Sequence, residues 1–115
     1  MLFRSELCAG ALAARYRELG GPVLYFGKPY RTSYGPTLEK LGLAQERPVL
    51  AVGDGLETDI RGACDVGLDS LLVTGGILGD ALGLKRHEVP SQTALEAACT
   101  DAGVRPTAAI AELRW

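Results

Sequence analysis

The sequence contains few histidine, cysteine and aromatic residues. Its 115 residues include one histidine and three cysteines, and aromatic residues make up 6% of the chain. The cysteines are widely spaced and form no Cys-x-x-Cys pair, which argues against a disulfide framework or a zinc-finger pattern. We therefore expect reduced thiols in a cytoplasmic protein. The single histidine, His87, stands among charged residues, and we expect it to lie in a solvated loop without a ligand role.

The sequence also lacks a surplus of positive charge and any long hydrophobic run. The chain has twelve Lys and Arg residues and fourteen Asp and Glu residues, so there is no basic excess to attract nucleic acid. The apolar stretches fall well short of the roughly 18 residues that span a bilayer. Charges at Arg4 and Glu6 interrupt any signal-peptide core. We expect neither nucleic acid nor a membrane as a partner.

What the chain does contain is typical of one globular domain. Hydrophobic residues make up 47% and charged residues 23%, and the length suits a single domain over residues 1–115. Short apolar runs alternate with amphipathic segments, which predicts an α/β fold with a parallel sheet flanked by helices. The continuous apolar run at 48–52 is typical of a buried parallel strand. Helices are predicted at 5–19, from about 33–36 to 42, at 59–66 and at 91–102; strands at 23–26, 48–52, 70–74 and 107–110; and a loop at 79–90.

The most informative segment is the run GDGLETD at residues 53–59. Asp54 leaves the end of a predicted buried strand, and Asp59 lies near the start of the following helix. Two carboxylates on such a turn can converge on one point, and hard oxygen ligands suit Mg²⁺. The alternative is that Asp59 only caps its helix and Asp54 only occupies a turn.

Lys28 is the second candidate, because it follows a predicted strand and a glycine. A lysine at the carboxyl edge of the sheet can neutralise a phosphate oxygen or a developing negative charge. Taken alone, a lysine at this position is more often a solvated loop residue. A dinucleotide fingerprint is not formed, since Thr58 stands at the last position of G-x-G-x-x-G.

Two stretches resemble a known family. GKPYRTSY at 27–34 and AVGDGLETDIRGACDVGLDSLLVTGGI at 51–77 are similar to the third and fourth motifs of the haloacid dehalogenase (HAD) superfamily. The branch is that of the capped (type IIA) sugar-phosphatase-like and nitrophenylphosphatase-like hydrolases, and the likeness covers roughly residues 9–115. It implies a Rossmann-like core and a Mg²⁺-dependent phosphohydrolase that acts on a phosphorylated small molecule. In the family, an aspartate nucleophile forms an aspartyl-phosphate that water then cleaves.

The resemblance assigns roles to three residues. Lys28 matches the lysine that stabilises charge on the nucleophile and the phosphate. Asp54 matches the direct Mg²⁺ ligand. Asp59 matches the second acidic residue, which supports the metal shell and orients Lys28. The resemblance thus makes Lys28 and Asp59 the expected catalytic residues and Asp54 and Asp59 the expected metal residues.

The first and second motifs of the family are missing from these residues, as is the cap. No aspartate has a second one two positions away, so there is no D-x-D nucleophile motif. We therefore expect a partial HAD core that is inactive alone, with a non-catalytic binding or interaction module as the alternative. A phosphorelay receiver domain fits less well, because its lysine follows the acidic pair. The strand at 48–52 would lack its neighbour, and we expect self-association through this open edge.

Overall fold

The structure is a computed structural model that describes residues 8–42 and 48–114. Its elements follow the order helix, helix, strand, helix, strand, helix, helix, strand, with two short helical turns between them. The helices are α1 (Ala9–Glu18), α2 (Gly35–Lys40), α3 (Arg61–Val66), α4 (Ile77–Ala81) and α5 (Gln92–Ala102); the turns are η1 (Arg31–Ser33) and η2 (Leu56–Ile60); and the strands are β1 (Leu50–Gly53), β2 (Asp69–Val73) and β3 (Ala108–Ile110).

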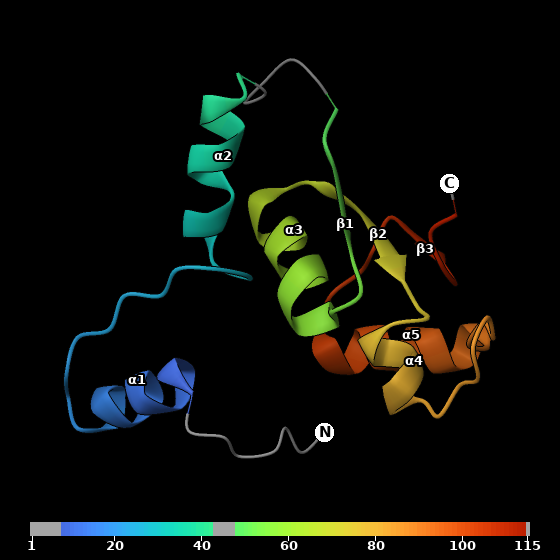
Figure 1. The fold of residues 1–115 in the computed structure, drawn as a ribbon, viewed down its shortest axis with the longest axis horizontal. Helices are drawn as coiled ribbons and strands as arrows, with labels where there is room; N and C mark the ends of the chain where they lie inside the picture. The colour runs from blue at the N-terminus through green and yellow to red at the C-terminus, as the bar shows by residue number, and fades with distance from the viewer. Residues whose placement is uncertain (1–7, 43–47, 115) are drawn as a thin grey trace.

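The three strands form one parallel sheet in the order β1-β2-β3. Leu50 of β1 pairs with Asp69 of β2, and Leu71 of β2 pairs with Ala108 of β3. Parallel neighbours need long crossovers, and here these carry α3 between β1 and β2 and α5 between β2 and β3 (Figure 1). The predicted α/β class is confirmed. All carboxyl ends of the strands therefore meet at one edge, where ligands bind in sheets of this kind.

A small apolar core lies between the sheet and the helices that follow the strands. Ile60 at the end of η2 and Leu72 in β2 are fully buried, and Leu78 and Val104 complete the buried cluster. Leu95 of α5 packs against this cluster from outside. The core therefore fixes the turn between β1 and α3, which is the segment that carries both candidate aspartates.

The predicted strand at 23–26 is wrong, because these residues pair with no described strand. They lie in no helix or strand, with Leu24 85% and Phe26 77% exposed. Figure 1 shows this segment and α1 lying apart from the sheet. Its composition favours a strand, but a strand forms only where a neighbouring strand supplies hydrogen-bond partners.

Three other predictions need correction at their boundaries. The loop predicted at 79–90 begins as helix α4, which buries Leu78. The helix predicted from Asp59 is preceded by the π-type turn η2, so the helical path begins at Leu56. The first helix is confirmed over Ala9–Glu18, and residues 5–7 of that prediction lie outside the described residues. None of the described helices is long and apolar enough to cross a membrane.

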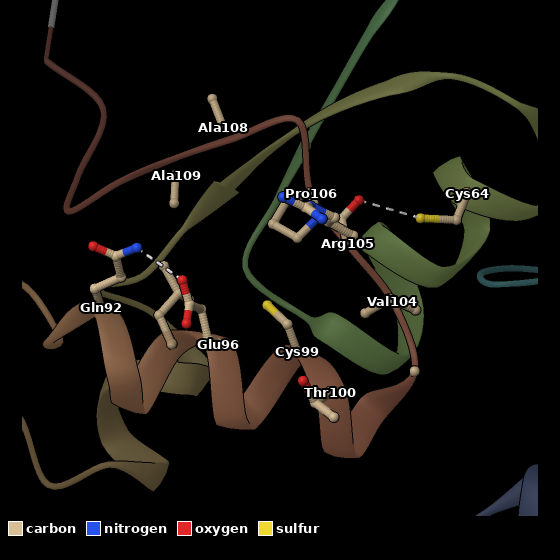
Figure 2. A pocket seen from close by; sticks show the side chains of 12 residues that line it. Cys64, Gln92, Glu96, Cys99, Thr100, Val104, Arg105, Pro106, Ala108 and Ala109 are labelled. Atoms are coloured by element: carbon tan, nitrogen blue, oxygen red, sulfur yellow. Dashed lines mark hydrogen bonds between the residues drawn. The ribbon is translucent and has the colours of Figure 1, made fainter.

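A groove of about 860 Å³ lies between α5 and the chain around β3 (Figure 2). Its walls include Cys64, Cys99 and Glu96. The Cys64 thiol donates to the carbonyl of Arg105 at 3.6 Å, and burial raises the pKa of the Cys99 thiol. A thiol with a raised pKa is a poor nucleophile at neutral pH. The candidate functional residues do not line this groove.

Candidate functional site

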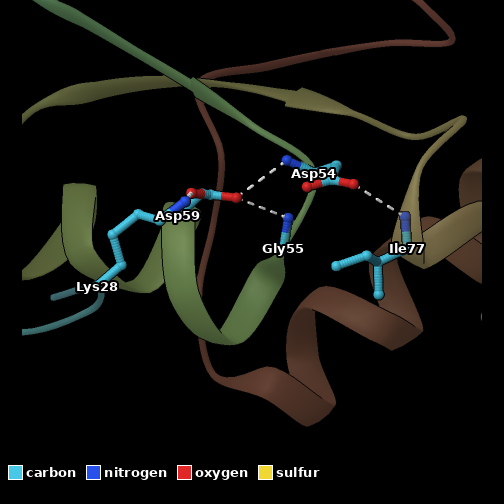
Figure 3. Close-up of polar contacts among 5 residues, drawn as sticks. All are labelled: Lys28, Asp54, Gly55, Asp59 and Ile77. Carbon is cyan, nitrogen blue, oxygen red and sulfur yellow. Dashed lines mark hydrogen bonds and ion pairs between the residues drawn. The ribbon is translucent and has the colours of Figure 1, made fainter.

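Asp59 is held by the backbone of its own turn. Its Oδ2 accepts hydrogen bonds from the backbone N–H groups of Asp54, at 3.2 Å, and Gly55, at 3.1 Å (Figure 3). The chain can fold this closely over the carboxylate because Gly53 has no side chain: a Cβ there would overlap Asp59. The loop that leaves β1 is therefore shaped around the Asp59 carboxylate.

Lys28 reaches the same carboxylate from a distant part of the sequence. Its Nζ forms an ion pair and hydrogen bond with Oδ1 of Asp59. The Asp59 side chain is only 11% exposed, whereas that of Lys28 is 56% exposed. Asp59 is thus the fixed member of the pair, and Lys28 is the member that faces solvent.

The surroundings of this pair favour the charged form of both side chains. Burial alone would raise the pKa of Asp59, but the Lys28 hydrogen bond and charge, with the N–H groups of Gly55 and Asp54, outweigh it and lower that pKa. The hydrogen bond to Asp59, followed by its charge, raises the pKa of Lys28. At neutral pH the site therefore contains an ammonium group and a carboxylate that orients it.

Asp54 points toward a different part of the molecule. Its Oδ2 accepts a hydrogen bond at 3.2 Å from the backbone N–H of Ile77, the first residue of α4 (Figure 3). Gly76 permits this approach, since a Cβ there would overlap the Asp54 carboxylate. Oδ1 of Asp54 accepts no hydrogen bond from any residue that the structure describes. One carboxylate oxygen of the half-buried Asp54 is therefore available to a ligand.

The oxygen atoms of this loop are of the kind that a magnesium site uses. Asp54 offers a hard oxygen, and Mg²⁺ is usually held by one or two carboxylates together with waters and phosphate. Both oxygens of Asp59 accept hydrogen bonds, Oδ1 from Lys28 and Oδ2 from the backbone of the loop that presents Asp54. Within residues 8–42 and 48–114, no three acidic, histidine or cysteine side chains form a metal-binding cluster.

A cleft of about 420 Å³ opens beside Asp54 at the carboxyl ends of the strands. Its polar lining comes from Asp54, Arg86, His87 and Glu112. His87 Nδ1 lies 2.6 Å from Glu112 Oε2, and Arg114 Nε donates to the other Glu112 oxygen at 2.5 Å. His87 is in an exposed loop, as expected, but no sequence pattern indicates that this loop reaches the cleft. The one available signal was that Glu112 lies two residues beyond the end of the last strand.

The described residues form a parallel α/β sheet with an acidic loop at the carboxyl end of β1 and a lysine paired to that loop. The class is therefore that of α/β proteins with a polar site at the carboxyl edge of the sheet. The comparisons with known proteins identify the family. A model of the HAD-hydrolase-like family matches residues 25–94, which is more than half of the chain. The chain therefore belongs to the haloacid dehalogenase-like hydrolases.

Individual relatives agree with this assignment. A dihydroxyacetone phosphatase from Corynebacterium glutamicum (strain R) is 34% identical over 62 residues, which cover 54% of this chain and 22% of that protein. A haloacid dehalogenase-like hydrolase from Brucella suis 1330 superposes with a TM-score of 0.59 at 32% identity, over 93% of this chain and 37% of that one. A p-nitrophenyl phosphatase from Archaeoglobus fulgidus gives 0.61 at 23% identity, over 88% and 34%, and shares the fold. The matched part of the chain thus spans between 22% and 37% of the length of these proteins.

Proposed function

We propose that this chain carries the metal- and phosphate-binding part of a Mg²⁺-dependent phosphohydrolase for a phosphorylated small molecule. The observation that carries the proposal is the Lys28–Asp59 pair, bound to the backbone of the loop that presents Asp54. The relatives support a phosphate ester as substrate, because two of them are named as a dihydroxyacetone phosphatase and a p-nitrophenyl phosphatase.

Each residue has a separate role in this proposal. The free oxygen of Asp54 would hold Mg²⁺, which neutralises charge on phosphoryl oxygens when bound. An ammonium group has three N–H donors, so Lys28 can pair with Asp59 and still donate to a phosphoryl oxygen. Asp59 fixes the direction from which Lys28 approaches and keeps it charged. Catalysis by such groups consists of positioning and electrostatic stabilisation.

The attacking carboxylate must come from elsewhere. The 115 residues contain no D-x-D motif, and both oxygens of Asp59 are already engaged. We propose that a segment outside these residues supplies the nucleophile and that the 115-residue chain does not turn over alone. Loss of a nucleophile costs many orders of magnitude in rate.

The test is hydrolysis of p-nitrophenyl phosphate by the 115-residue chain with and without Mg²⁺, combined with Mg²⁺-dependent binding of inorganic phosphate followed by NMR. We expect no turnover, but phosphate binding that requires Mg²⁺ and is lost in Asp54→Asn. Glu57→Gln, which changes an exposed carboxylate on the same loop, is the matched control and should bind as the wild type does. Turnover that disappears in Asp54→Asn would instead place the attacking group within this chain or a second copy of it.

The missing D-x-D motif also supports a second candidate function, a non-catalytic binding or interaction module on the same scaffold. The NMR arm of the experiment separates the two candidates. Absence of any Mg²⁺-dependent phosphate binding would favour the interaction module and contradict the phosphohydrolase proposal.

We also propose a cytoplasmic location. Cys8, Cys64 and Cys99 are all free thiols in the structure, and free thiols are typical of a reducing compartment.

A further inference from the structure

A tight turn brings two basic side chains to the cleft that Asp54 lines. The backbone N–H of Glu88 donates to the carbonyl of Lys85 at 3.0 Å, and the N–H of Lys85 donates to the Glu88 carboxylate at 2.7 Å. These bonds close a β-turn with Arg86 and His87 at its two central positions. Both of these residues line the same cleft as Asp54.

The turn has an unusual backbone that a specific contact supports. His87 has φ 67°, and it is the one residue other than glycine with a left-handed backbone in the described part of the chain. Such a conformation costs free energy for a side-chain-bearing residue, and it is retained where surrounding contacts hold it. Here His87 pairs with Glu112, which Arg114 also holds. The turn is thereby fastened to the segment that follows β3, and its place on the cleft wall is fixed.

Arg86 stands at this fixed position without a partner of its own. Its guanidinium forms no hydrogen bond or ion pair with any described residue, whereas the cleft carboxylate of Glu112 is already paired twice. A guanidinium presents paired N–H groups that match a carboxylate or a phosphate. A cleft of about 420 Å³ has the size of a small-ligand site.

We propose that Arg86, held in place through the His87–Glu112 contact, binds a second anionic group on the substrate. The inference rests on the proposed function, which puts the phosphate to be cleaved at Asp54 and Lys28. It narrows the substrate class to phosphate monoesters whose leaving part carries a carboxylate or another phosphate. Asp54 and Arg86, which line the same cleft, would then contact the two charged ends of one small molecule.

The test compares ligands that differ in one group. The ¹⁵N-labelled chain is titrated in Mg²⁺ with 3-phosphoglycerate and with glycerol 3-phosphate, which replaces the carboxylate by a hydroxymethyl group. Fructose 1,6-bisphosphate and fructose 6-phosphate form the second pair and ask whether the second group is a phosphate. In at least one pair, we expect the ligand with two anionic groups to bind about tenfold more tightly than the ligand with one. Its binding should shift the NMR signals of the Arg86 and His87 amides.

Two variants assign the preference to a residue. Arg86→Gln should abolish this preference, so that the two members of each pair bind with equal affinity. Lys85→Gln removes a charge from the same turn but not from the cleft lining, and it should keep the preference. Equal affinities within both pairs, or a preference that survives Arg86→Gln, would overturn this inference.

The outcomes also separate this inference from the proposed function. Glycerol 3-phosphate binding that needs Asp54, with no preference for a second anion, overturns the role of Arg86 alone. Absence of Mg²⁺-dependent binding for all four ligands overturns the proposed function and this inference together.

Discussion

At the scale of single residues, the Asp59 carboxylate is the most heavily bonded group in the candidate site. It accepts one hydrogen bond from a lysine and two from the backbone, and it is nearly buried. The spacing of Asp54 and Asp59 correctly suggested that they belong to one turn. It did not show that both oxygens of Asp59 are engaged, because this depends on where Lys28 lies in the fold. For the same reason the sequence did not reveal that Arg86 lines the same cleft as Asp54.

The lowered pKa of Asp59 predicts a pH-dependent contribution to stability. A carboxylate with a lower pKa in the folded state stabilises that state above its unfolded pKa, about 3.9. This contribution is lost as the pH falls through the folded pKa. At pH 7, Asp59→Asn should therefore lower the free energy of unfolding by about 1–3 kcal/mol. The difference from the wild type should shrink as the pH falls below about 4.

Urea unfolding at a series of pH values measures this difference. Asp101→Asn, at an exposed position in α5, is the control and should change stability little at any of these pH values. A deficit for Asp59→Asn that stays the same size at pH 7 and at pH 3 would contradict the proposed role of the Asp59 charge.

At the scale of elements, helix α5 shows where local sequence signals suffice. Ser91 is a residue type that commonly caps helices, and its hydroxyl oxygen accepts a hydrogen bond from the backbone N–H of Ala94 at 3.2 Å. Gly103 ends the helix with a left-handed backbone, φ 64°. Both signals act within one turn of the chain. The failed strand at 23–26 depended instead on a distant partner, which no local pattern encodes.

The Ser91 cap gives the prediction at this scale. Ser91→Ala should lower the free energy of unfolding by about 1 kcal/mol, because a backbone N–H of the first turn loses its acceptor. Ser91→Asp keeps an acceptor oxygen and should stay close to the wild type. Thermal or urea unfolding followed by circular dichroism measures both variants. An aspartate variant that loses as much stability as the alanine variant would show that the hydrogen bond contributes nothing.

At the scale of the whole molecule, β1 is an edge strand of the sheet with an unpaired backbone edge among the described residues. This strand pairs only with β2 among the described strands, and its Leu50 and Val52 are 53% and 46% exposed. The unpaired backbone groups of an edge strand offer hydrogen bonds to another chain. The exposed apolar residues beside them add area that association would remove from water.

We therefore predict that the 115-residue chain self-associates as its concentration rises. Size-exclusion chromatography with light scattering should show a mass above that of the monomer, 12.1 kDa. Leu50→Lys should shift the chain toward the monomer, because charge on an edge strand opposes pairing. Val89→Lys, at an exposed apolar residue outside the sheet, should leave the mass unchanged. A monomer at all concentrations would contradict this use of the edge.

The loop that folds around Asp59 affects how such an association would proceed. Every hydrogen bond that shapes it, including the bond from Lys28, is made within this chain. Association costs free energy mainly because the partners lose freedom of motion and because flexible segments become ordered. A segment that docks beside β1 would meet a loop that is already ordered, so the ordering penalty would fall on the incoming segment alone. A separately produced segment of the same fold would then assemble with this chain with little rearrangement of the loop.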